Sequence, residues 1–272
     1  MPTITLLAKA YSGFQKKVVD EVLKDTLGDL NASVRFVETT SRGWARVNVS
    51  GEDEKIAMNL LEKEIGICPV ELHALKEFST VKGLISALDK NKNVVSVDIG
   101  VHSPEIVDAT IPLHDLQAQL ADGRKVPLGK IANIFGFCKN LPLNVKILRI
   151  DSEEGQVEAS LAERQLEQYR GWTRSMFDRL IVLGASSQNV EWALNVNEYA
   201  RDVVAVEPLG LFENAIVCKL GTDAAGLIPR IGKSLHRATL TVFSPRRIIE
   251  FLGNNTHHCL SSSDEVDVYE DQ

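Results

Sequence analysis

The sequence predicts an α+β protein of several domains: an N-terminal β-α-β-β-α module, a central small β-barrel and a C-terminal α+β block. Three observations support this prediction. The chain of 272 residues exceeds the usual single domain, and its 44% apolar and 25% charged residues are typical of a globular protein. Strand and helix patterns interleave over residues 1–78. Short strands about ten residues apart follow, which is typical of a barrel.

The N-terminal module covers residues 1–78. We expect a strand at 4–11, an amphipathic helix at 16–27 that Gly28 stops, strands at 33–38 and 43–51, and a second helix at 52–66. A small sheet with both helices on one face is the natural packing of this order, as in ferredoxin-like or KH-like domains.

The central domain covers residues 79–170. Strands are expected at 79–86, 91–100, 108–116, 142–151 and 156–166, with a hairpin turn at 152–156 in which Gly155 is left-handed. The run at 161–172, which overlaps the last strand, is expected to be helical. Alternation places a common set of side chains inside the barrel, namely Val95, Val97, Ile99, Val145, Ile147 and Val157. Asp98, between two of them, is expected on a solvent face.

The C-terminal block covers residues 171–256. A strand at 178–186 and a helix at 187–202 should precede strands at 203–210, 214–221, 224–229 and 237–244. Residues 215–229 repeat the order strand, Gly, loop and Ile-Pro found in residues 94–112. This block could therefore include a second half-barrel, each Pro ending a strand where its missing N–H does no harm.

Charge and composition restrict the location and the partners. The net charge is −7, and residues 257–272 form a polar, acidic tail that we expect to be disordered. The four cysteines are widely spaced without a CxxC pair, so reduced thiols are expected. Neither a signal peptide nor a membrane span is recognisable, which predicts a cytoplasmic protein without a membrane partner.

Two basic runs are the candidate binding sites. Residues 117–150 hold several Lys and Arg residues and one acid, Asp122, and residues 228–247 hold basic residues and no acid. Such local excess of positive charge is what contacts to nucleic-acid phosphates require, although solvated strand faces look the same. The candidate RNA-binding residues are Arg124, Lys125, Lys130, Arg230, Lys233, Arg237, Arg246 and Arg247.

Other motifs favour structural roles. The segment 221–229, GTDAAGLIP, lacks the signatures of a P-loop or a dinucleotide fold, and its Gly residues and Asp223 suit a tight connection. No spacing brings Asp98, Asp108 and Asp223 together, and His257, His258 and Cys259 form only a partial metal site. The sequence therefore predicts no catalytic residue, no metal site and no cofactor, hence a protein that is not an enzyme.

Two resemblances extend this reading. The segments VKGLIS, VVSVDIG, DATIPLHDL, VKILRID and QVEASL, across residues 81–161, resemble the OB-fold RNA-binding repeat named after a small-subunit ribosomal protein, with a longer insert at 117–141. The resemblance implies an OB-like barrel and RNA binding. The segments RGWARVNVSGED and VCKLGTDAAGLIPRIG are similar to an uncharacterised archaeal family known as a domain of unknown function, which brings no established activity.

These observations lead to two functional hypotheses. The first is a non-enzymatic RNA-binding protein of the translation or RNA-processing machinery, which contacts the phosphate backbone of structured RNA through the two basic runs and could associate with a ribosomal or RNA-processing protein. The second is a protein-binding adaptor without nucleic-acid affinity, which uses sheet edges or the acidic tail.

Overall fold

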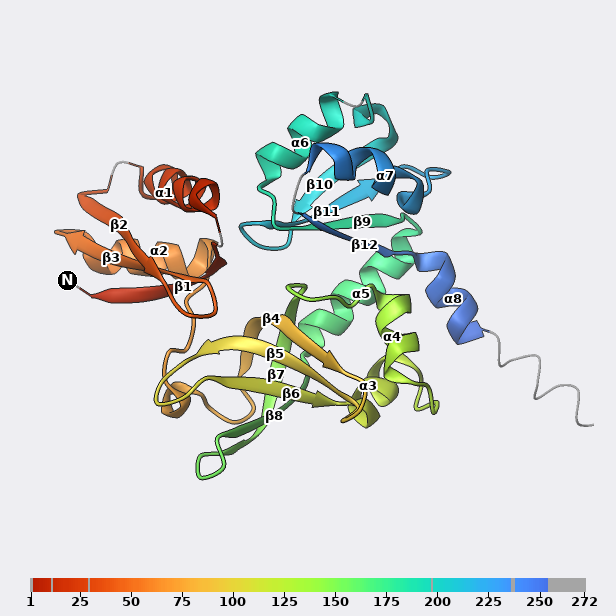
Figure 1. Ribbon diagram of the computed structural model, residues 1–272, viewed down its shortest axis with the longest axis horizontal. Helices are drawn as coiled ribbons and strands as arrows, with labels where there is room; N and C mark the ends of the chain where they lie inside the picture. The colour runs from red at the N-terminus through yellow and green to blue at the C-terminus, as the bar shows by residue number, and fades with distance from the viewer. Residues whose placement is uncertain (1, 11, 29, 197, 236–237, 254–272) are drawn as a thin grey trace, which may run out of the picture.

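The structure is a computed structural model that describes residues 2–253, apart from residues 11, 29, 197 and 236–237. It has the expected mixed α+β architecture, with a closed barrel that follows an N-terminal block and precedes a C-terminal block in the chain (Figure 1). The acidic tail predicted at 257–272, with its His and Cys residues, lies outside the described residues.

The N-terminal block has the predicted β-α-β-β-α order. Strands β1 (Thr3–Lys9), β2 (Ala32–Thr39) and β3 (Trp44–Gly51) form an antiparallel sheet in the order β1-β3-β2, with helices α1 (Gly13–Leu27) and α2 (Glu54–Glu64). Ser12 and Gln15 form a capping box that starts α1, and Gly28 ends it as predicted. Val19, Leu23 and residues of α2 and β3 share one core.

The central block is a closed five-stranded barrel. It consists of β4 (Thr80–Asp89), β5 (Val94–Val101), β6 (Val107–Pro112), β7 (Pro142–Asp151) and β8 (Gln156–Leu161), closed in the order β4-β5-β6-β8-β7. Only β6 and β8 pair in parallel. This is an OB-like Greek-key barrel. The six side chains predicted to lie inside it are all buried, and Gly155 is left-handed, with φ 62°.

The long insert between β6 and β7 is helical. It holds α3 (Leu113–Leu120) and α4 (Leu128–Phe135), and α5 (Glu163–Ser175) follows the barrel. The strand expected at 108–116 stops at Pro112, which lies at the N-cap of α3. Leu116 and Leu120 are buried four residues apart, so residues 113–120 present a helical apolar face rather than an alternating one.

The C-terminal block is an open antiparallel sheet. Its elements are β9 (Arg179–Leu183), α6 (Ser187–Val196), β10 (Val203–Pro208), β11 (Glu213–Cys218), α7 (Ala224–Ser234), β12 (Thr239–Phe243) and α8 (Pro245–Gly253). A short 3₁₀ turn at Ala200–Asp202 lies between α6 and β10, and another, Leu72–Ala74, lies between α2 and β4. The sheet order is β10-β11-β9-β12. A β-α-β-β-α-β unit in this order is ferredoxin-like.

The prediction that this block includes a second half-barrel is therefore wrong. Residues 224–229 belong to α7, and Pro229 lies inside that helix rather than at a strand end. Ala224, Leu227 and Ile231 are buried at helical spacing, and the Asp223 side chain accepts a hydrogen bond from the Ala225 amide at the helix start. The burial of this apolar face outweighs the cost of one helix-interior proline.

One core joins the barrel to the C-terminal block. Ile181 and Leu183 of β9 belong to the same buried cluster as the barrel interior, together with Phe135 of α4, Tyr169 of α5 and Ile248 of α8. Leu180 and Val182, which point to the other face of the sheet, pack with α6 and α7. The C-terminal sheet is thus covered by α6 and α7 on one face and by the barrel side of the molecule on the other.

Two further features concern the helices and the cysteines. None of the helices in the described part of the chain combines the length and apolar character that a bilayer span needs. Cys68, Cys138 and Cys218 are free thiols, as predicted.

Candidate nucleic-acid interface

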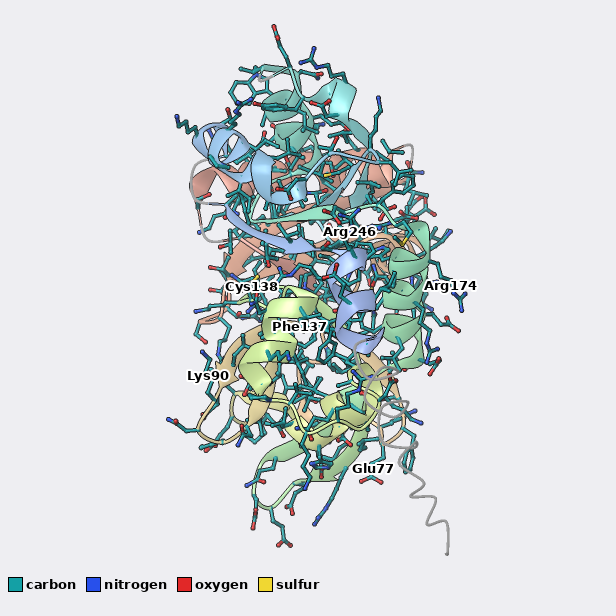
Figure 2. All side chains as sticks on the ribbon, turned by 90° about the vertical axis from the view of Figure 1, so that its right-hand side faces the viewer. Glu77, Lys90, Phe137, Cys138, Arg174 and Arg246 are labelled. Carbon is teal, nitrogen blue, oxygen red and sulfur yellow. The ribbon has the colours of Figure 1, made fainter. Side chains whose placement is uncertain are left out.

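Residues from both basic runs meet on one surface formed by α4 and α8. Arg124, Lys125 and Lys130 of the first run and Arg247 of the second line a concavity of about 410 Å³, in which Glu250 is the only acid among the described residues. Arg246 is exposed at the start of α8, next to Arg247. Figure 2 looks onto this face, with α8 between α4 and α5. We call these five cations the α4–α8 basic surface.

Arg124 holds the surface together. Its guanidinium donates to the carbonyls of Phe251 (2.7 Å) and Leu252 (2.5 Å), at the C-terminal end of α8. Unpaired carbonyls and the negative end of the helix dipole favour a cation there. Arg124 and Lys130 also lie over the ring of Phe251, 5.9 and 5.3 Å from its centroid. Arg124 therefore docks α8 against the α3–α4 connection and so joins the two basic runs.

The remaining predicted residues lie elsewhere. Arg230 and Lys233 are exposed on α7, which covers the opposite face of the C-terminal sheet. Arg230 bonds the Tyr199 hydroxyl and lies over its ring. Arg237 lies outside the described residues. In the first run, Lys146 packs over the Phe78 ring and Arg149 pairs with Asp151 on the barrel.

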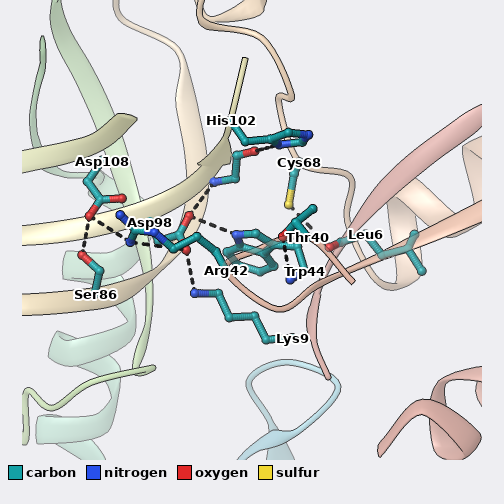
Figure 3. A network of polar contacts seen from close by, with 11 residues as sticks. Leu6, Lys9, Thr40, Arg42, Trp44, Cys68, Ser86, Asp98, His102 and Asp108 are labelled. Carbon is teal, nitrogen blue, oxygen red and sulfur yellow. Dashed lines mark hydrogen bonds and ion pairs between the residues drawn. The ribbon is translucent and has the colours of Figure 1, made fainter. Parts of the chain in front are cut away.

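The sequence predicted that Asp98 lies on a solvent face, and this prediction is wrong. Asp98 points out of the barrel but is covered by the N-terminal block and is 1% exposed. Its carboxylate accepts from Lys9 Nζ at 2.6 Å, from Trp44 Nε1 at 3.0 Å and from the Gly100 amide at 3.0 Å (Figure 3). Lys9 also lies 4.5 Å from the centroid of the Trp44 ring. A buried carboxylate needs such partners.

Arg42 extends this network to β6. Its guanidinium lies 3.3 Å from Asp108 Oδ2 and 4.0 Å from Asp98 Oδ2, and Ser86 donates to Asp108 at 2.7 Å (Figure 3). Asp98 and Asp108 are therefore neighbours, while Asp223 caps α7 and is not part of the group. The outward side of β5 and β6 is occupied by carboxylates and the N-terminal cations that neutralise them, which disfavours a phosphate backbone there.

A second cavity, of about 680 Å³, lies where the three blocks meet. Its lining includes Lys9 and Gln15 of the N-terminal block, Trp192 of α6 and the buried carboxyl of Glu213. Burial raises the pKa of Glu213 to about 7, against the opposing effects of the Phe212 amide and of the nearby lysines. The sequence did not reveal this cavity, because its walls come from segments far apart in the chain.

Lys82 of β4 lines a different cavity but is close enough to Glu213 for their charges to interact. Its ammonium donates to the Leu209 carbonyl at 2.5 Å, and burial lowers the pKa of Lys82. The carboxyl of Glu213 acts in the opposite direction and favours the charged lysine.

Within the described ranges, one group of side chains has metal-ligating potential. His114, Asp115 and Glu158 offer ligand atoms within 4.8 Å of one another at the surface. His114 is exposed and lies 3.6 Å from the Asp115 carboxylate. Three surface ligands with no further donor resemble an ordinary polar surface more than the closed four-ligand sites of structural metals.

Family models match the chain in three consecutive segments. They are described as the DUF2110 N-terminal domain over residues 3–69, the DUF2110 central domain over residues 75–173 and the DUF2110 C-terminal domain over residues 177–243. No curated protein matches the sequence.

Solved structures show only distant similarity. An uncharacterized protein from Methanocaldococcus jannaschii aligns with 32% of this chain and 93% of its own, at 10% identity and a TM-score of 0.22. A complex of a/eIF2alpha, aDim2p and rRNA from Pyrococcus horikoshii aligns with 47% of this chain and 70% of the matched chain, at 11% identity and a TM-score of 0.25. Such low TM-scores support no argument about this chain.

Proposed function

This chain belongs to the DUF2110 family, and we propose that it is a non-enzymatic RNA-binding protein of the translation or RNA-processing machinery. It would contact the phosphate backbone of structured RNA through the α4–α8 basic surface. The observation that carries the proposal is that cations from two segments more than a hundred residues apart come together on one exposed surface. The role is one of binding and needs no chemical step from the protein.

The electrostatics of the surface support this proposal. Among the described residues, its five cations have two acidic neighbours, Asp122 beside Arg124 and Glu250 on α8, which leaves a formal excess of three positive charges. The rest of the chain has a net negative charge, so a polyanion is attracted to this surface and repelled by much of the remainder. A phosphate backbone, with its regularly spaced charges, matches such a surface.

The character of the side chains favours backbone contacts over base reading. Trp44 and Trp172 are buried, and Phe251, the aromatic residue that lines the concavity, is partly buried beneath Arg124 and Lys130. The exposed rings of Phe78 and Trp192 are not among the residues that line it. Reading of single-stranded bases depends on exposed aromatic rings. The sequence resemblance of the barrel to the ribosomal-protein repeat is consistent with RNA as the polyanion.

The test replaces Lys125, Lys130, Arg246 and Arg247 with Ala. Arg124 is kept because it caps α8. Filter binding of a structured RNA, measured across a salt series, should show weaker binding by the quadruple variant. The slope of log K against log salt should fall by about 3, since each lost phosphate contact removes about 0.7–0.9.

The matched control is Arg230→Ala with Lys233→Ala on α7, which removes two exposed cations from the opposite face of the C-terminal sheet. This variant should keep the wild-type slope within about half a unit. Equal losses in both variants would show that binding follows net charge rather than the α4–α8 basic surface. A wild-type protein that shows no RNA binding at physiological salt would end the proposal in favour of a protein-binding adaptor.

A further inference from the structure

A third cavity, of about 390 Å³, lies between the N-terminal block and the barrel. Its walls are the turn between β2 and β3, the end of β1, one turn of α1, Ser86 of β4 and Lys139 after α4. It lies beside the network of Figure 3, where Lys9, Thr40, Arg42 and Ser86 are drawn. It is distinct from the α4–α8 basic surface, with which it shares no residue.

The lining has a single chemical character. It contains four cations and four hydroxyl side chains and no carboxylate; these residues are Lys9, Lys16, Arg42, Lys139, Thr39, Thr40, Ser41 and Ser86. Asp98 and Asp108, which pair with Lys9 and Arg42, are close by but are not among the lining residues. Four positive and two negative charges leave a formal excess of two positive charges.

Two of the cations are available to a ligand. Lys16 lies over the ring of Phe36, at 5.6 Å, a contact that leaves its charge uncompensated. The side chain of Lys139 has no hydrogen-bond or ion-pair partner among the described residues. Arg42 has further N–H groups besides the one directed at Asp108. An anion in the cavity could thus be contacted by Lys16 of α1, by Arg42 of the β2–β3 turn and by Lys139 between α4 and β7.

The turn is built to keep its hydroxyls in place. The Gly43 amide donates to the Thr40 carbonyl at 2.8 Å, and the left-handed φ of Gly43, 88°, closes the turn. The Thr40 hydroxyl accepts from the Trp44 amide at 3.1 Å, which leaves its hydrogen to donate. The Ala10 amide donates to the Gly43 carbonyl and ties the turn to β1.

We propose that this cavity is a binding site for a phosphate group carried by a small molecule or by the end of a nucleic acid. Phosphate offers several acceptor oxygens and up to two negative charges, which match hydroxyl and cationic donors on three sides and the formal charge of the lining. The volume lies at the lower end of small-ligand sites. The proposal does not depend on RNA binding by the α4–α8 basic surface.

The first experiment titrates inorganic pyrophosphate by calorimetry into the full-length protein. Lys16→Ala with Lys139→Ala should weaken binding by at least tenfold, because each lost charge-assisted hydrogen bond costs about that factor. Lys17→Ala removes an equal charge from the neighbouring, exposed position on α1, outside the cavity, and should change binding less than twofold. Both lysines of the double variant are surface side chains, and circular dichroism verifies the fold.

A second experiment separates the two sources of phosphate. Binding of one short RNA is compared with and without a 5′-phosphate, and a preference that the double variant loses identifies a nucleic-acid end. Pyrophosphate binding without that preference identifies a free small molecule. The proposal is overturned if wild-type protein binds neither probe, or if the double variant binds both as the wild type does. The quadruple variant of the α4–α8 basic surface should retain pyrophosphate binding, so that the two proposals can fail separately.

Discussion

Asp98 and Glu213 show how much a single buried carboxyl depends on what lies beyond its own strand. Alternation along β5 places Val97 and Ile99 inside the barrel and Asp98 outside, which is correct. The outside is nevertheless buried, because Trp44 and Lys9 cover it. Asp98 has a cation in contact, whereas Glu213 has only more distant lysines, and burial keeps its pKa high.

Glu213 should make stability depend on pH. Its folded pKa of about 7 lies above the unfolded value of 4.5, so the folded state holds a proton that the unfolded state releases, and stability falls as pH rises between these values. Between pH 5 and 8 the loss should be roughly 2–3 kcal/mol. Urea unfolding of Glu213→Gln should show a correspondingly flatter profile. The lysines that face Glu213, Lys82 and Lys9, stay in both proteins, and identical profiles would contradict the assignment.

Helix α8 was not anticipated, although its start carries a recognisable signal. Ser244 followed by Pro245 is a good helix start, because proline's missing N–H is harmless in the first turn. Ile248 is buried in the core shared by the barrel and the C-terminal sheet, and Ile249 is 45% exposed. The helix thus carries Arg246 and Arg247 on a firmly docked element.

Truncating either isoleucine of α8 tests this docking. Ile248→Ala should lower the free energy of unfolding by about 2–4 kcal/mol through lost burial and a cavity. Ile249→Ala, the same chemical change one residue later, should cost no more than about 0.5 kcal/mol. Urea denaturation of both variants provides the measurement. Equal costs would mean that α8 is not held by its buried face.

At the scale of the molecule, the buried apolar clusters do not follow the boundaries of the three family segments. The barrel and the C-terminal sheet share one large apolar cluster. The core of the N-terminal block includes Phe212 from the C-terminal block, and the N-terminal block meets the barrel through the charged network of Figure 3 and a small apolar cluster of Leu7, Trp44, Cys68 and Leu84. An interface of this mixed kind is more polar than the shared core. The barrel and the C-terminal block should therefore behave as one unfolding unit.

Hydrogen exchange can detect that unit. Leu183→Ala, in β9, should lower the protection of slowly exchanging amides in β5 and β7 by the same free energy as in β9, because all three strands contribute to one core. Leu23→Ala, in the N-terminal core, should lower protection in β1 and β3 and leave β5 and β7 nearly unchanged. Loss confined to the C-terminal sheet in Leu183→Ala would refute the shared unit.

Local pattern was sufficient for most of the fold. Period-two alternation identified the five barrel strands and their buried side chains, and helical spacing with the Gly28 stop identified α1. It failed at residues 224–229, where a short apolar run containing Pro229 is compatible with either a strand or a helix, and only packing against the C-terminal sheet decides.

The candidate sites divide in the same way. The sequence identified Arg124, Lys130 and Arg247 as an excess of local charge, because charge is a property of composition. Their meeting on one surface, and the separation of Arg230 from it, depends on how α8 docks against α4. The burial of Asp98 and the cationic cavity around Lys16 likewise arise from contacts between blocks. Such contacts join residues far apart in the chain, and no local periodicity records them.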